Sequence, residues 1–101
     1  MAKSIYSKEY NLFLRHLRAA RKLAGLTQGE LAVRLRRTQA FVSKCERGER
    51  RVDFIELRHF CSAMGISVTR FVKTLEKAVH DECPSSVSNR SGALLTKKSH
   101  D

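Results

Sequence analysis

The sequence predicts an all-α fold in which five short helices form one small domain. Three observations support this prediction. Apolar residues recur at steps of three and four over the first 79 positions, capping residues precede the apolar segments, and glycines follow several of them. A chain of 101 residues is long enough for one core of this kind. We therefore expect a folded domain over residues 1–83 and a tail over residues 84–101.

The first helix is predicted over residues 7–24. Ser7 can accept a backbone hydrogen bond as the N-cap, and Glu9 would lie near the positive end of the helix. Gly25 suits the left-handed position that closes a helix. One face of this segment is apolar and is expected to point inward, with Tyr10, Phe13, Leu14, Leu17, Ala20 and Ala24.

The second and third helices are predicted close together over residues 27–48. Thr27 and Glu30 form a T-x-x-E capping box, in which each side chain accepts from the other residue's backbone N–H. Thr38 is the expected N-cap of the third helix, and Gly48 is its expected end. The residues expected to point inward are Leu31, Ala32, Leu35, Val42 and Cys45.

The fourth and fifth helices are predicted to begin at Asp53 and Ser67, with Gly65 between them and an end near residue 79. Asp53 and Glu56 repeat the capping box. The expected inward residues are Phe54 or Ile55, then Leu57, Phe60, Cys61, Met64, Val68, Phe71, Val72 and Leu75. Residues 84–92 hold four serines, a proline and a glycine, a composition that predicts a disordered tail.

The positive charge of the chain is concentrated in one part of the sequence. The net charge is +10, and residues 1–79 hold seventeen basic and seven acidic residues, so they carry all of it. Residues 15–51 alone hold eleven lysines or arginines and three acids, a net +8. A localised positive field favours a polyanion, most often nucleic acid, although a solvated basic face is the alternative.

Several classes of function are disfavoured by the residues present. The three cysteines form no C-x-x-C, and Cys45 and Cys61 fall at apolar helical positions, so we expect reduced core residues. The histidines are scattered and no catalytic motif is present, so we expect no metal, cofactor or enzymatic activity. We see no signal peptide or membrane span, and we expect a cytoplasmic, nucleoid-associated protein.

Two short helices joined by a tight turn over residues 27–48 suit a protein that lays one helix in the major groove of DNA. Gln39, at the start of the second of these helices, can bond adenine N6 and N7. Ala40 is short enough to allow close approach and to touch a thymine methyl. Lys44 can reach guanine or phosphate, with phosphate preferred, and Ser43 can bind either a base or the backbone.

Phosphate contacts are expected around this helix. Gln28 lies at a helix N-terminus, where backbone amides favour an anion. Arg50 and Arg51 follow the third helix and are the preferred clamps, with Arg47 and Arg37 next. For Phe41 two interpretations stay open, namely packing against the second helix or the loop between the third and fourth helices, and contact with a thymine methyl or a sugar. The full predicted DNA-binding set is Gln28, Arg37, Thr38, Gln39, Ala40, Ser43, Lys44, Arg47, Arg50 and Arg51.

Over residues 10–79 the chain resembles the XRE-type, or Cro and phage-repressor type, helix-turn-helix regulators. The matching residues are Leu17, Arg18, Arg21, Gly25 to Gln28, Glu30 to Ala32, Val42, Ser43, Glu46 to Arg51, Leu57 and Met64 to Ser67. The resemblance implies a five-helix repressor-type helix-turn-helix DNA-binding domain that acts as a dimer. It also implies a phosphate contact for Gln28, an adenine contact for Gln39, and a structural ion pair between Arg21 and Glu46.

The chain departs from the family pattern at two positions. Arg36 stands in the turn where the family often has glycine, so a left-handed conformation there would cost roughly 1 kcal/mol. Val52 stands where many members have proline, and we expect this change to loosen the connection between the third and fourth helices.

We therefore predict a sequence-specific regulator of transcription, a repressor, that binds double-stranded DNA as a homodimer. The two copies are expected to contact each other through the fifth helix. The alternative is an antitoxin or adaptor whose main partner is a protein held by the tail or the fifth helix. A controller of a restriction–modification operon would use the same chemistry in another genetic setting. A stoichiometric protein partner gripping residues 80–101 would favour the adaptor.

Overall fold

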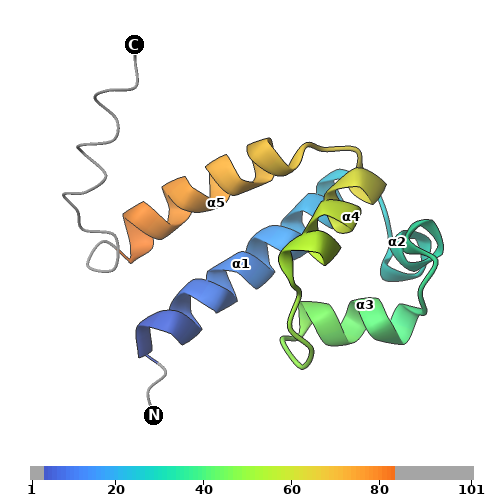
Figure 1. Cartoon of the computed structure of the whole chain (residues 1–101), viewed down its shortest axis with the longest axis horizontal. Helices are drawn as coiled ribbons and strands as arrows, with labels where there is room; N and C mark the ends of the chain where they lie inside the picture. The colour runs from blue at the N-terminus through green and yellow to red at the C-terminus, as the bar shows by residue number, and fades with distance from the viewer. Residues whose placement is uncertain (1–3, 84–101) are drawn as a thin grey trace.

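The computed structural model describes residues 4–83, and over this range it contains five helices and no strand, as predicted. The helices are α1 (Ser4–Leu23), α2 (Gln28–Leu35), α3 (Gln39–Glu46), α4 (Phe54–Met64) and α5 (Val68–Glu82). The long helices α1 and α5 lie side by side, whereas α2 and α3 stand together at the opposite end from the last turn of α5 (Figure 1). The tail predicted over residues 84–101 lies outside the described residues.

All five helices contribute to one core. Its fully buried members include Leu17 of α1, Leu31 of α2, Val42 of α3 and Phe60 of α4, and Phe71 of α5 is 4% exposed. The buried thiols of Cys45 and Cys61 fill space in the same cluster, as the sequence predicted. Burial of side chains from all five helices fixes the position of α3 relative to the rest of the domain.

The predicted capping residues define the helix starts from α2 onward. The Thr27 hydroxyl accepts from Glu30 N–H at 3.0 Å, and the Glu30 carboxylate accepts from Thr27 N–H at 2.9 Å. Asp53 and Glu56 make the same reciprocal pair at α4. The single caps at α3 and α5 are also present, and Gly65 closes α4 with a φ of 76°.

The predicted start of the first helix is wrong. α1 begins at Ser4, so Ser7 lies within the helix as an exposed residue and is not its N-cap. No proline or glycine precedes Ser7, so nothing in the chain forces the helix to start there. Ala24 follows the last residue of α1 and is exposed, whereas the inward face of α1 buries Leu12 and Arg21.

Three predicted core residues of α4 and α5 are exposed. Phe54 is 60% exposed and Ile55 is 55% exposed, so the expectation that one of them points inward is wrong. Phe54 borders an open cleft between α1, α4 and α5, because the first turn of α4 lies at the edge of the core. Val72 of α5 is 37% exposed, and α5 extends three residues beyond the predicted end.

Candidate nucleic-acid interface

The turn between α2 and α3 is three residues long, and it sets the angle at which α3 leaves α2. Arg36 adopts the left-handed conformation, with φ 60° and ψ 41°. The turn therefore has the backbone shape that glycine often provides in the family, although arginine stands here. Its backbone N–H and that of Arg37 bond to the last carbonyls of α2, including Arg37 N–H to Ala32 at 2.9 Å. These bonds offset the cost of roughly 1 kcal/mol that the left-handed conformation carries for a residue with a side chain.

α3 buries one face and exposes the other. Val42, Cys45 and Glu46 are buried, each at 1% exposure or less. The opposite face carries most of the predicted recognition residues, of which Thr38, Gln39, Ala40 and Lys44 are exposed and Ser43 is half-buried. Thr38 also caps the helix, because its hydroxyl accepts from Phe41 N–H at 3.1 Å. The exposed face is therefore a free polar surface on a fixed helix.

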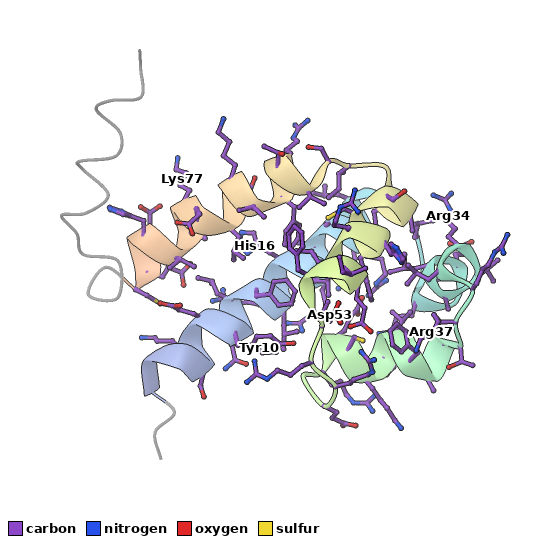
Figure 2. The ribbon with its side chains drawn as sticks, in the orientation of Figure 1. Tyr10, His16, Arg34, Arg37, Asp53 and Lys77 are labelled. Carbon is purple, nitrogen blue, oxygen red and sulfur yellow. The ribbon has the colours of Figure 1, made fainter. Side chains whose placement is uncertain are left out.

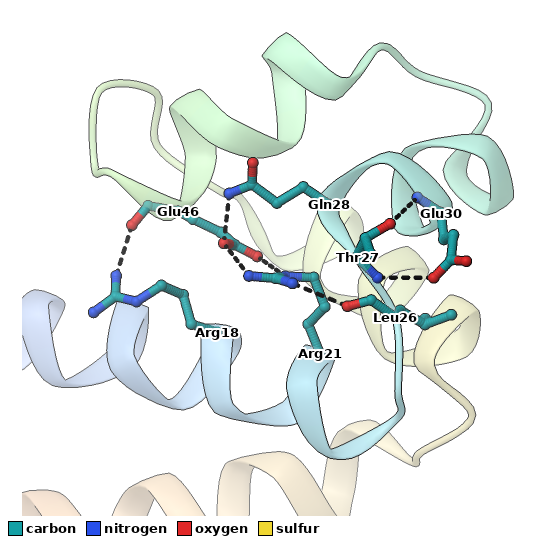
Figure 3. A network of polar contacts seen from close by, with 7 residues as sticks. All are labelled: Arg18, Arg21, Leu26, Thr27, Gln28, Glu30 and Glu46. Carbon is teal, nitrogen blue, oxygen red and sulfur yellow. Dashed lines mark hydrogen bonds and ion pairs between the residues drawn. The ribbon is translucent and has the colours of Figure 1, made fainter.

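A buried ion pair holds the C-terminal end of α3 against α1. Arg21 Nε lies 2.7 Å from Glu46 Oε2 and Arg21 Nη2 lies 3.1 Å from Glu46 Oε1, a bidentate pair that joins the two residues matched by the family resemblance (Figure 3). The side chains are only 10% and 1% exposed. Arg21 also donates to the Leu26 carbonyl at 2.9 Å, and Arg18 donates to the Glu46 carbonyl at 2.9 Å.

Gln28 takes part in the same network, and the sequence did not predict this contact. Its Nε2 donates to Glu46 Oε1 at 3.0 Å, so the side chain ties the N-terminus of α2 to α3 (Figure 3). An amide NH₂ has two N–H donors, so one donor and the carbonyl oxygen are left for other partners. The phosphate contact expected for Gln28 remains a prediction and would use these groups.

Phe41 packs inside the protein, the first of its two open interpretations. Its ring centroid lies 6.2 Å from that of Phe60 in α4, a partner that the prediction did not name. The guanidinium carbon of Arg37 lies 3.7 Å from the Phe41 centroid, and that of Arg50 lies 4.8 Å from it. Figure 2 shows Arg37 near the α2–α3 end of the molecule, well away from Lys77 on α5. The Phe41 ring thus positions Arg37 and Arg50, two residues that are predicted to contact phosphate.

The arginines after α3 are held by neighbouring side chains. Arg50 pairs with Glu56, with an Nη2 to Oε2 distance of 2.8 Å. Arg51 lies over the Tyr10 ring at 4.3 Å. The Tyr10 hydroxyl accepts from Val52 N–H at 3.2 Å, a bond that proline could not make. The predicted loosening at Val52 is therefore wrong, because this N–H anchors the connection to α1.

Arg47 pairs with Glu49 two residues later. Arg47 Nε lies 2.9 Å from Glu49 Oε2 and Arg47 Nη2 lies 3.1 Å from Glu49 Oε1, while Nη1 donates to the Ser43 hydroxyl. The hydrogen bond from Arg47 lowers the pKa of Glu49, and the bond from Arg50 lowers that of Glu56. Both carboxylates are therefore ionised at neutral pH and orient the arginines that they face.

The remaining titratable and metal-binding groups show no second site in the described chain. Burial raises the pKa values of the Cys45 and Cys61 thiols, so both stay protonated in the core. Within residues 4–83 no three histidine, cysteine or carboxylate side chains gather to hold a metal ion. None of the helices described is both long and apolar enough to cross a bilayer.

Comparison with known proteins identifies the family. A family model described as a helix-turn-helix domain matches residues 12–71, more than half of the chain. An XRE-family like protein from Pseudomonas syringae pv. tomato str. DC3000 has a similar structure, with a TM-score of 0.71 and 45% sequence identity. The match covers 75% of this chain and 93% of that one. The chain belongs to the XRE-type helix-turn-helix family.

As an XRE-type helix-turn-helix protein, the chain is a DNA-binding regulator. In this family α2 and α3 form the helix-turn-helix, so the exposed face of α3 is the candidate reading surface. A comparison with curated proteins found no match.

Proposed function

We propose that this XRE-type protein is a sequence-specific repressor that binds double-stranded DNA as a dimer on a near-palindromic operator. One observation carries the proposal. α3 is locked to α1 by the buried Arg21–Glu46 pair while its opposite face stays exposed and polar. A rigid helix with a free polar face can enter the major groove without rearrangement, which keeps the entropic cost of binding low.

The exposed residues of α3 supply base contacts in this proposal. Gln39 pairs with adenine through its amide, and Ala40 touches a thymine methyl. Lys44 is exposed and binds phosphate, because most protein–DNA hydrogen bonds go to the backbone. Around them Gln28, Arg37, Arg50 and Arg51 form the proposed phosphate-contacting rim.

Dimerisation is proposed through α5 and the connection from α4. A single recognition helix reads only a few base pairs, and two copies one helical turn apart, roughly 34 Å, read two half-sites. α1 separates α5 from α3 in Figure 1, so a second copy on α5 would leave the α3 face open. Val72 is an exposed apolar residue on α5, but the exposed Thr69, Lys73 and Lys77 keep the contact small.

Selection of bound duplexes from a random pool, followed by competition binding, tests the proposal. The wild-type protein should enrich an inverted repeat. Gln39→Ala should lose roughly 1–3 kcal/mol of discrimination at one base pair of each half-site, whereas Lys44→Ala should weaken all duplexes alike. Gln39 and Lys44 are both exposed on α3, so the two substitutions should affect folding equally little. Comparing the two variants therefore separates a loss of specificity from a loss of fold. A wild-type protein that enriches no sequence would contradict the proposal.

A further inference from the structure

The side chain of Arg47 lies on the reading face of α3, although the residue itself follows the helix. Gln39, Ser43 and Arg47 stand at four-residue steps, so they form one row along the helix surface. Arg47 is the C-cap of α3, and its Nη1 donates to the hydroxyl of Ser43 one turn earlier. The guanidinium therefore lies beside the middle of the helix and not at its end.

Glu49 holds the guanidinium in this place. Its two carboxylate oxygens accept from Arg47 Nε at 2.9 Å and Nη2 at 3.1 Å. The chain turns back after α3 because Gly48 takes a φ of 82°, and Glu49 N–H bonds to the Lys44 carbonyl at 2.9 Å. The position of the Glu49 backbone is therefore fixed by the turn, and its side chain reaches Arg47 along a short path.

The two contacts leave part of the guanidinium for another acceptor. A guanidinium has five N–H donors, and Glu49 and Ser43 together take one on each of its three nitrogens. One N–H then remains on each of the two terminal nitrogens. Two donors on one arginine match the O6 and N7 acceptors that guanine presents in the major groove.

Resting on the proposed function, we propose that Arg47 reads a guanine in each half-site and that Glu49 is the positioning residue that presents it. The sequence suggested a phosphate contact for Arg47. The row that it shares with Gln39 and Ser43, and the carboxylate that fixes it there, point to a base contact. A salt-bridged arginine loses little side-chain freedom on binding, which favours a contact that demands defined geometry.

The proposal also gives the position of the guanine. Ser43 lies four residues beyond Gln39, which corresponds to about 6 Å along an α-helix. Base pairs follow one another at about 3.4 Å along each strand, so the guanine should lie about two base pairs from the adenine that Gln39 reads. The selected operator should therefore contain both bases at this spacing.

The test measures affinity for the selected duplex and for a duplex in which this guanine is replaced. Arg47→Lys keeps the charge but not the planar fork, so we expect the guanine preference to fall by roughly 5- to 150-fold. Glu49→Gln should lose several-fold of the preference with helical content and melting temperature unchanged, because Glu49 is 54% exposed. Glu9→Gln makes the same charge change on α1, away from the reading face and from the proposed dimer surface, and should keep the preference.

The outcomes separate the inference from the proposed function. If Arg47→Lys weakens both duplexes equally, Arg47 contacts phosphate and the inference is overturned while the proposed function stands. The same conclusion holds if Glu49→Gln keeps the guanine preference as Glu9→Gln does. If the wild-type protein prefers no duplex, the proposed function itself fails.

Discussion

Replacing Arg21 with alanine should destabilise the domain strongly, because it would strand a buried carboxylate. Glu46 is 1% exposed and accepts two hydrogen bonds from Arg21 and one from Gln28. After the substitution the Glu46 carboxylate would keep only the bond from Gln28, and the Leu26 carbonyl would lose its Arg21 donor. Removing one partner of a buried pair costs about 3–5 kcal/mol.

This loss is large for a domain of this size. At about 0.05–0.15 kcal/mol per residue, the roughly 80 folded residues have a free energy of unfolding of about 4–12 kcal/mol. A small domain loses about 4–8 °C of melting temperature for each kcal/mol. We therefore expect Arg21→Ala to lower the melting temperature by at least about 12 °C or to leave the domain largely unfolded.

Thermal and urea unfolding followed by circular dichroism would measure the effect. Arg15→Ala is the matched control, because the Arg15–Glu82 pair is more than half exposed and should contribute under about 1 kcal/mol. The double variant Arg21→Met with Glu46→Met should be more stable than Arg21→Met alone, since no buried charge is left unpaired. An Arg21→Ala protein within about 1 kcal/mol of the wild type would refute the reasoning.

Three further predictions concern DNA, acid and assembly. If about six phosphates are engaged, affinity for duplex DNA should fall by roughly a thousandfold or more between about 50 and 200 mM salt, and a salt-independent affinity would argue against the phosphate rim. Arg50 and the Asp53 N–H lower the pKa of Glu56, so the stability that this carboxylate adds is complete above the ordinary glutamate pKa of 4.5 and is lost as the pH falls through the lower folded value. Glu56→Gln should therefore flatten the decline in stability below pH 4.5, and an unchanged acid profile would count against the pairing. A chain ending at residue 83 should keep its helical signal and sediment with two copies on each palindromic duplex, whereas a single copy at saturation would exclude the dimer.

The sequence predicted the parts of the fold that depend on neighbouring residues. The capping boxes at Thr27 and Asp53 lie within four residues of their partners, so their spacing alone identifies them. Once Thr38 is fixed as the N-cap, the inward positions of Val42 and Cys45 determine which face of α3 is exposed. The candidate reading face therefore follows from local signals.

Contacts between distant helices were not predictable in the same way. Three contacts depend on how two elements meet in space. They are the Gln28–Glu46 bond, the stacking of arginines on Phe41 and the bond from Val52 N–H to the Tyr10 hydroxyl. The predicted burial of Phe54 or Ile55 was wrong for a related reason. Periodicity identifies an apolar position in a helix, but it does not show whether another helix packs over that position. Because Gln28 Nε2 donates to Glu46, only one amide N–H and the amide oxygen of Gln28 remain for DNA.

The central claim is that α3 lies in the major groove, and methylation interference tests it most directly. Dimethyl sulfate methylates guanine N7 in the major groove and adenine N3 in the minor groove of the same duplex. On the duplex selected by the wild-type protein, methylation of guanine N7 should prevent binding, and methylation of adenine N3 should have little effect. Interference confined to adenine N3 would contradict the claim.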